Sequence, residues 1–407
     1  MASIDARTAL TPVRLVWGAA ILGTLVKILI AGTTVGTDDV HYWTDFAQGA
    51  MDRGPVGIYA IDFSEALYNH GPLSSWLLVL LGHLADLGAS FPLLIRLPAA
   101  LADLVTTVVL FTLLRGLRGD RPAALAAVVF SLSPLALIVS GFHGNTDPVF
   151  VMFLLLSVLA LTVHHSGWWA GVAFGLALSV KIVPVVALPV LLVLAWRLGR
   201  PVFRRFLLGG ALVFALLWVP VLVAEPGPFV SHVLGYSGIT LRQWGVSQLL
   251  SWSGLSWSTM IQVGDSIRFV LVAVSALLPA VLVHRRPWRD GVALAGLPLC
   301  LFLVLSPAFS MQYLVWALAP ALLLVGLRVA VTYVGLASLF ALIVYSGWNG
   351  AWPWSWHEAH STPLPTVVMP LMVLTWLALV RVCWVGAVGS TVPGDVVAPV
   401  GELSGAH

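Results

Sequence analysis

The sequence carries very little charge. Only 9% of its 407 residues are Asp, Glu, Lys or Arg, whereas 59% are hydrophobic. A soluble globular protein has about 25% charged and about 45–50% apolar residues, so this chain lacks the charge to cover a surface that faces water. The composition predicts an all-α polytopic membrane protein. It argues against nucleic-acid binding, even though 20 Lys and Arg outnumber 17 Asp and Glu.

Cysteine is almost absent. The two cysteines, Cys300 and Cys383, both lie inside apolar runs. They provide neither a disulfide framework nor the spacing of metal ligands, and a free cysteine packs as a small hydrophobic residue. The sequence also lacks an internal repeat and any stretch polar enough to form a soluble domain. Both cysteines are therefore expected in the membrane-embedded core.

Long apolar runs fill most of the chain. A helix needs about 20 apolar residues to cross a bilayer. The first run lacks a clear small-residue cleavage site, so we interpret it as an uncleaved span rather than a signal peptide. The clear candidates are 15–32, 93–114, 122–142, 149–165, 206–224, 267–283, 291–306, 311–327, 329–347 and 364–384.

Two further segments, 72–88 and 168–197, are ambiguous, and the arginines decide both. Basic residues concentrate on the cytoplasmic side of membrane proteins. The arginine-rich loops share one side only if 72–88 lies along the outer interface and 168–197 is a tight hairpin turning near Lys181. This topology has twelve spans with both termini in the cytoplasm. It makes 1–385 the membrane domain and 386–407 a flexible cytoplasmic tail.

A few polar residues on the outer side stand out. Most outer acids need no explanation beyond their tolerance in loops, but Asp38 and Asp39 directly follow the first span. Asp147 lies in a short turn between two spans. Lys181 sits in an apolar hairpin, where a lysine is costly unless it meets a partner or ligand. Its alternative is to snorkel to the membrane interface.

Two more outer cations are candidates for ligand binding. Arg96 begins a span, and Arg242 lies among aromatic residues of the loop 225–266. Cations and a carboxylate above a membrane body suit a reaction on a lipid phosphate of the outer leaflet. The cations would hold the phosphate while the carboxylate deprotonates an acceptor hydroxyl. Lys27, within the first span, is expected to snorkel outward or to pair with Asp103.

Five segments resemble motifs of the GT-C membrane glycosyltransferases, in that family's order over residues 13–320. Residues 36–40 (GTDDV) resemble the first-loop aspartate motif. Residues 68–73 (YNHGPL) are similar to the Tyr-x-Tyr/His-Pro-Pro-Leu stretch, although Gly71 replaces its first proline. The others are 141–148 (GFHGNTDP), similar to the second-loop Asp-Pro element, Lys181 with Pro184 (Lys-x-x-Pro), and 306–313 (SPAFSMQY).

The resemblance implies an inverting transfer of sugar from a polyprenyl-phosphate donor outside the cytoplasm. It implies Asp39 as the general base, with Asp38 beside it. The donor phosphate would be held by Lys181, Arg242 and Arg96. The substrate-binding residues implied are Asp147, His143, Asn145, His70, Tyr68, Gln312 and Tyr313. Because adjacent carboxylates repel each other, we also expect one pKa of the Asp38–Asp39 pair to be raised.

The resemblance also implies partners and a location. No cofactor or metal is expected to be required: the oligosaccharyltransferase branch binds a divalent metal, but 38–39 lacks Asp-x-Asp spacing. The partners would be the bilayer, the donor and a glycolipid or glycan acceptor, at the outer face of a bacterial plasma membrane. Mannose is a first guess for the sugar. The alternatives are a transporter or lipid-linked sugar flippase, and a non-catalytic envelope subunit.

Overall fold

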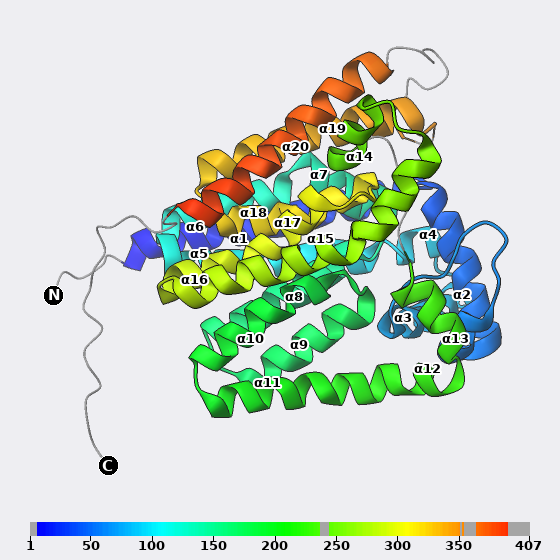
Figure 1. The fold of residues 1–407 in the computed structure, drawn as a ribbon, viewed down its shortest axis with the longest axis horizontal. Coiled ribbons are helices and arrows are strands. Elements are labelled where there is room, and N and C mark those ends of the chain that lie inside the picture. Colours follow the sequence, from blue (N-terminus) through cyan, green and yellow to red (C-terminus); the bar gives the residue numbers. More distant parts are fainter. Residues whose placement is uncertain (1–5, 237–243, 351, 354–363, 390–407) are drawn as a thin grey trace.

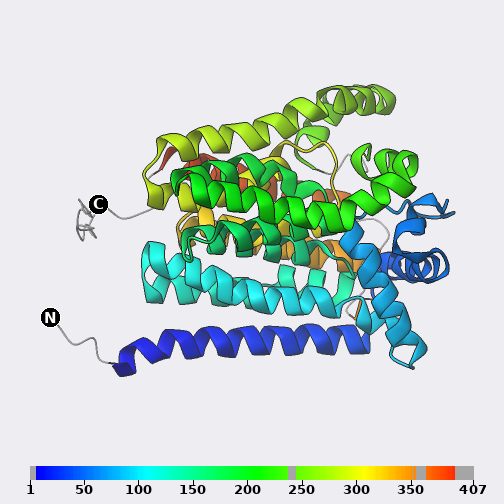
Figure 2. The ribbon, with the colours of Figure 1, turned by 90° about the horizontal axis from the view of Figure 1, so that it is seen from below.

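The structure is a computed structural model that describes residues 6–236, 244–350, 352–353 and 364–389. Every secondary-structure element in these ranges is helical. Long helices run side by side along the bundle, and shorter helices gather at one of its ends (Figures 1 and 2). Helix α1 begins, and helix α20 ends, at the opposite end of the bundle (Figure 1). The prediction of an all-α membrane protein is confirmed.

Seven helical stretches of the described ranges are long and apolar enough to cross a membrane. They are Thr11–Thr33, Phe91–Arg118, Arg200–Ala224, Trp257–Arg285, Trp288–Leu305, Leu327–Gly347 and Val367–Val388. An eighth candidate is the pair Asp120–Leu132 and Pro134–His143, bent by 41°. Four shorter apolar helices are Asp147–Thr162, Gly167–Val180, Val183–Arg197 and Met311–Leu324. Each predicted span has a counterpart here, while the number that crosses the bilayer stays a prediction.

The elements that position the site have the following bounds. The first half of the chain contributes α1 (Ala6–Thr33), α2 (Asp38–Gly57), α3 (Pro72–Asp86), α4 (Phe91–Leu94), α5 (Leu97–Arg118), α6 (Asp120–Leu132), α7 (Pro134–Ile138), η2 (Val139–His143), α8 (Asp147–Thr162) and α9 (Gly167–Val180). The second half contributes η3 (Val183–Ala187), α10 (Leu188–Arg197), α11 (Arg200–Val213), η5 (Val230–Leu234), α15 (Trp257–Arg285), α17 (Leu297–Leu305), η7 (Met311–Ala317), α18 (Leu318–Leu324), α19 (Leu327–Trp348) and α20 (Leu364–Val388).

Helices α2 and α3 form a cap with its own small core at one end of the bundle (Figure 1). Trp43 and Phe46 of α2 and Leu78 of α3 are buried in this core. Helix α3 covers the segment 72–88, which we predicted to lie at the interface, and it is packed against α2 rather than among the long helices. The α2–α3 cap therefore lies over the ends of the long helices on this side of the bundle.

Two breaks in the apolar helices bring polar residues to the capped end. Pro134 lacks the N–H needed to continue a helix, so α6 ends before it, and Ser133 caps α7 by accepting from the Ala136 N–H at 3.2 Å. A π-helical turn, η2, then ends at His143. Lys181 follows α9 in an extended conformation, and the turn η3 begins two residues later with Val183 and Pro184. The predicted break of the 168–197 hairpin at Lys181 is confirmed.

A lysine and an aspartate form an ion pair inside the bundle. The Lys27 ammonium is 2.9 Å from a carboxylate oxygen of Asp103, with side chains only 1% and 6% exposed. Ser140 of η2 donates to the same carboxylate oxygen at 2.6 Å. Of the two outcomes expected for Lys27, the structure has the pairing with Asp103.

Candidate active site

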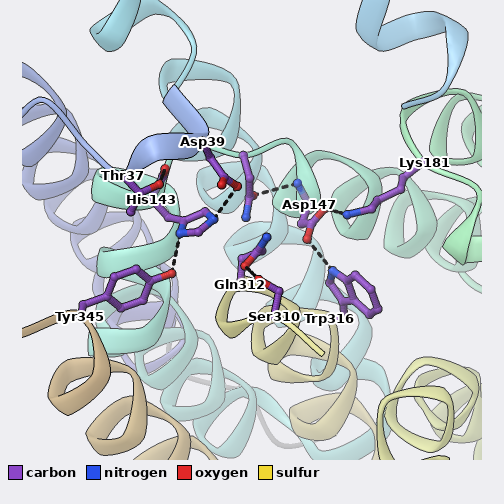
Figure 3. A network of polar contacts seen from close by, with 10 residues as sticks. Thr37, Asp39, His143, Asp147, Lys181, Ser310, Gln312, Trp316 and Tyr345 are labelled. Carbon is purple, nitrogen blue, oxygen red and sulfur yellow. Dashed lines mark hydrogen bonds and ion pairs between the residues drawn. The ribbon is translucent and has the colours of Figure 1, made fainter. Parts of the chain in front are cut away.

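The first-loop aspartates lie in the first turn of α2, directly after α1. Asp38 is exposed to solvent, whereas Asp39 turns inward and its side chain is 36% exposed. A carboxylate oxygen of Asp39 lies 2.9 Å from Nε2 of His143 (Figure 3). The Thr37 hydroxyl donates to the backbone carbonyl of His143 at 2.7 Å. The end of the first span is thus joined to η2, and only one aspartate of the pair faces the protein.

Asp147 is almost completely enclosed by its neighbours. Its side chain is 1% exposed, and one oxygen accepts from Nζ of Lys181 at 2.8 Å. The other accepts from the indole N–H of Trp316, also at 2.8 Å (Figure 3). Its backbone N–H donates to the side-chain oxygen of Asn145 at 3.0 Å. With both oxygens occupied, Asp147 is arranged to hold a cation in place.

Lys181 combines this ion pair with an aromatic bed. Its ammonium lies 5.0 Å from the ring centroid of Tyr313 and 5.2 Å from that of Trp316. A cation over aromatic faces at these distances is stabilised by the ring quadrupole. The side chain is still 12% exposed. A lysine held this way is fixed in position and retains an exposed edge.

The open edge faces an apolar groove of about 260 Å³. Residues of η3, η5, η7, α15 and the segment 306–308 line it, and Asn69, Tyr236 and Arg268 add polar groups. An apolar groove with a few convergent polar groups is the usual form of a ligand site. Here it would accommodate a lipid chain whose anionic head lies against Lys181.

Electrostatics at Asp39 differ from the expectation. Burial by itself would raise the pKa of Asp39, but the hydrogen bond with His143 and the positive charge of Lys181 lower it below its ordinary value. The repulsion expected from Asp38 does not raise this pKa, because Asp38 points into solvent. The predicted rise is wrong, and the Asp39 carboxylate stays ionised at neutral pH.

His70 is a neutral imidazole beside this charge. Burial lowers its pKa to about 3, with the Lys181 charge adding to the effect. Its ring packs against Trp43 at an interplanar angle of 40°, with centroids 4.3 Å apart. Its Nδ1 is buried and has no hydrogen-bond partner among the described residues, and the same holds for the Tyr68 hydroxyl and the side-chain nitrogen of Asn145. These are groups that a bound substrate could satisfy.

Arg96 does not have the role predicted for it. It is completely buried, and its Nε donates to the Pro92 carbonyl at 2.6 Å. The rest of the guanidinium donates to oxygens of Ala31, Thr34 and Gly141. All its donors are used to tie the end of α1 to α4 and η2, so none is left for a phosphate. Arg242 lies outside the described residues.

The remaining predicted residues lie near the Asp147 group. Gln312 accepts a short hydrogen bond from the Ser310 hydroxyl, and Tyr313 forms part of the aromatic bed under Lys181. Sequence reasoning missed Tyr345, whose hydroxyl lies 2.6 Å from Nδ1 of His143. It also assigned no role to Trp316. Each is an aromatic residue with a polar atom in an apolar helix, and that signal alone does not separate them from ordinary interface aromatics.

Within the described ranges, no group of three or more His, Cys, Asp or Glu side chains is placed to hold a metal ion. Whether the protein needs a metal therefore stays an experimental question, and the expectation that none is required remains a prediction.

Comparisons with known proteins bear on this arrangement. The family model described as dolichyl-phosphate-mannose-protein mannosyltransferase matches residues 69–223, which confirms the resemblance to GT-C glycosyltransferases over less than half of the chain. ArnT from Cupriavidus metallidurans bound to undecaprenyl phosphate is 16% identical, with a TM-score of 0.44 over 93% of this chain and 77% of that one. The apo structure of the same protein is also 16% identical, with a TM-score of 0.45 over 95% of this chain and 78% of that one. No curated protein matches the sequence.

Proposed function

We propose that this protein is an inverting glycosyltransferase that moves a sugar from a polyprenyl-phosphate donor to a hydroxyl group of a glycolipid or glycan. Mannose is the first sugar to test. The reaction would take place at the outer face of a bacterial plasma membrane. One observation carries the proposal: Asp39, a partly exposed carboxylate, lies at the same end of the bundle as Lys181, which stands at an apolar groove.

The donor would bind through its phosphate and its lipid. Lys181 supplies a fixed positive charge, and the groove beside it is mostly apolar. The family-model match supports the same donor class, because its description names a dolichyl-phosphate sugar. Asp147 and Trp316 would position Lys181 rather than touch the sugar, since both Asp147 oxygens are already occupied.

In the chemical step, the acceptor oxygen attacks the anomeric carbon as Asp39 takes its proton. The bond between that carbon and the phosphate oxygen breaks, and polyprenyl phosphate leaves with one more negative charge than it had in the donor. Lys181 would stabilise that charge as it develops. A low pKa weakens Asp39 as a base but keeps all of it ionised, which suits an acceptor hydroxyl that becomes acidic only as its bond to carbon forms.

Sugar transfer by the reconstituted protein tests the proposal. Labelled polyprenyl-phosphate mannose, glucose and arabinose are supplied with an envelope lipid extract, with and without chelator. We expect transfer by the wild type, none by Asp39→Asn, and no effect of chelator. Equal transfer by Asp39→Asn would remove the assigned base. Loss of activity with chelator would show that a metal is required.

The buried Lys27–Asp103 pair is the observation that favours a transporter or flippase, because charges inside a membrane often mark a translocation path. That alternative predicts donor lipid that changes leaflets in vesicles without any transferred sugar. It also predicts that Asp39→Asn leaves this movement intact, so the same vesicles separate the two functions.

A further inference from the structure

Three residues from distant parts of the chain form one line of hydrogen bonds. Tyr345 of α19 lies 2.6 Å from Nδ1 of His143, and Nε2 of the same ring lies 2.9 Å from the Asp39 carboxylate (Figure 3). Tyr345 is 5% exposed and the His143 side chain 8%. Water therefore has little access to the imidazole, and its two neighbours decide where its proton lies.

For a neutral His143 ring, only one placement of the ring proton satisfies both neighbours. The tyrosine hydroxyl can donate to Nδ1, which leaves the ring proton on Nε2, where it is donated to Asp39. With the proton on Nδ1 instead, the lone pair of Nε2 would face the carboxylate lone pairs. The hydrogen bond that Nδ1 accepts therefore places the ring proton on Nε2.

We propose that Tyr345 is a positioning residue that holds His143 in the Nε2–H tautomer, so that His143 fixes one oxygen of Asp39 and leaves the other free for the acceptor hydroxyl. The inference rests on the proposed function for its catalytic meaning. The tautomer itself depends only on the geometry. Tyr345 lies in α19, outside the segments that resemble the family motifs.

The backbone around His143 supports a fixed ring rather than a mobile one. Thr37 donates to the His143 carbonyl at 2.7 Å. The ring of Phe142 contacts Tyr345 edge-on, with centroids 6.0 Å apart. Gly144, which follows His143, has a positive φ of 81°. A Cβ at this position would lie 2.5 Å from a side-chain carbon of Val40. The turn that presents His143 is therefore closely packed on both sides.

Transfer kinetics test the role of Tyr345 through a double-mutant cycle. Tyr345→Phe should lower kcat about tenfold, the order expected for one lost positioning hydrogen bond, and leave the donor KM within about twofold. A glutamine at 143 keeps an N–H donor for Asp39 but has no tautomer to set. Adding Tyr345→Phe to His143→Gln should therefore cost nothing further. Equal losses in both backgrounds would show that Tyr345 acts only through packing.

Tyr333 provides the matched control. It is a fully buried tyrosine on the same helix, and its hydroxyl donates to the Leu314 carbonyl at 2.8 Å. It lies twelve positions earlier on α19, which is about 18 Å along a helix. Tyr333→Phe should change kcat less than about twofold. A loss equal to that of Tyr345→Phe would overturn the specific role of Tyr345.

Nitrogen NMR of ¹⁵N-histidine-labelled protein in lipid nanodiscs tests the tautomer without any substrate. The His143 signals are identified by their absence from His143→Gln. We expect Nε2–H in the wild type and a mixture of the two tautomers in Tyr345→Phe. An unchanged tautomer in Tyr345→Phe would overturn the proposal. The expected change, found in a protein that transfers no sugar, would support the tautomer lock and count against the proposed function alone.

Discussion

Two lysine–aspartate pairs of nearly equal length occupy different places in the bundle. The sealed cluster consists of Lys27, Asp103 and Ser140, with an ammonium–carboxylate distance of 2.9 Å. The open cluster consists of Asp39, His143, Asp147 and Lys181, and its Lys181–Asp147 distance is 2.8 Å. Lys27 is 1% exposed and has no open edge, whereas Lys181 is 12% exposed beside a groove.

The two pairs differ in burial more than in pairing, and we propose that this difference separates a structural ion pair from one that meets a ligand. A pair closed on all sides cannot exchange its partner, and breaking it leaves an uncompensated charge. The sealed cluster also supports the open one. Ser140 lies in the same π-helical turn as His143, and a Cβ at Gly141 would lie 3.0 Å from Cα of Lys27. The interior pair therefore holds the turn on which His143 is presented.

Removing the base should have the largest effect on activity and little effect on the fold. Asp39→Asn should lower transfer by about 10²–10⁴-fold, the usual contribution of a general base. Its amide oxygen can still accept from His143, so the melting temperature should stay close to that of the wild type. Asp38→Asn is the matched control. A greater loss of transfer in Asp38→Asn would mean that the neighbouring carboxylate is the base.

Breaking the sealed cluster should instead have its main effect on stability. Lys27→Met leaves Asp103 buried without its cation and should lower the free energy of unfolding by about 3–5 kcal/mol. The double change Lys27→Met/Asp103→Leu removes both charges and should recover most of that loss. Chemical denaturation in detergent measures the free energy of unfolding of the wild type, the single variant and the double variant. A double variant as unstable as the single one would mean that packing or Ser140, rather than charge, explains the cost.

Acid should destabilise the capped end through His70. Its pKa is about 3 in the folded protein and about 6.5 when unfolded, so the unfolded chain binds more protons between these values. The free energy of unfolding should therefore fall as pH drops below about 6.5, by at most about 2 kcal/mol at pH 5. Thermal melts of wild type and His70→Phe at pH 7 and pH 5 measure this contribution. The same pH slope in both proteins would assign it to other groups.

Much of the open cluster was predictable because its residues stand out against apolar sequence. Asp39, Asp147 and Lys181 are charges beside spans, and the arginine distribution placed them on one side. The structure brings Asp147 and Lys181 into direct contact. The helix break at Lys181 was predictable from Pro184 and Pro189, because proline interrupts a helix whatever the tertiary contacts are.

What could not be predicted depends on tertiary contacts. Arg96 and Lys181 are both cations at helix ends, and only packing shows that Arg96 is enclosed by carbonyl oxygens of α1, α4 and η2. Tyr345 and His143 are 202 positions apart, and nothing local marks them as partners. Only the motif resemblance separated Asp39 from Asp38 in the sequence, and the helical turn that begins with them points only Asp39 inward.

The most direct measurement compares Lys27→Gln with Lys181→Gln for binding of undecaprenyl phosphate and for stability in the same preparation. We predict that Lys181→Gln weakens binding about ten- to hundredfold, the range for losing a hydrogen bond to a charged group, while Lys27→Gln stays within about twofold. Lys27→Gln should show the larger loss of melting temperature. Equal binding by both variants, or weaker binding by Lys27→Gln, would contradict the assignment of the open cluster to the donor phosphate.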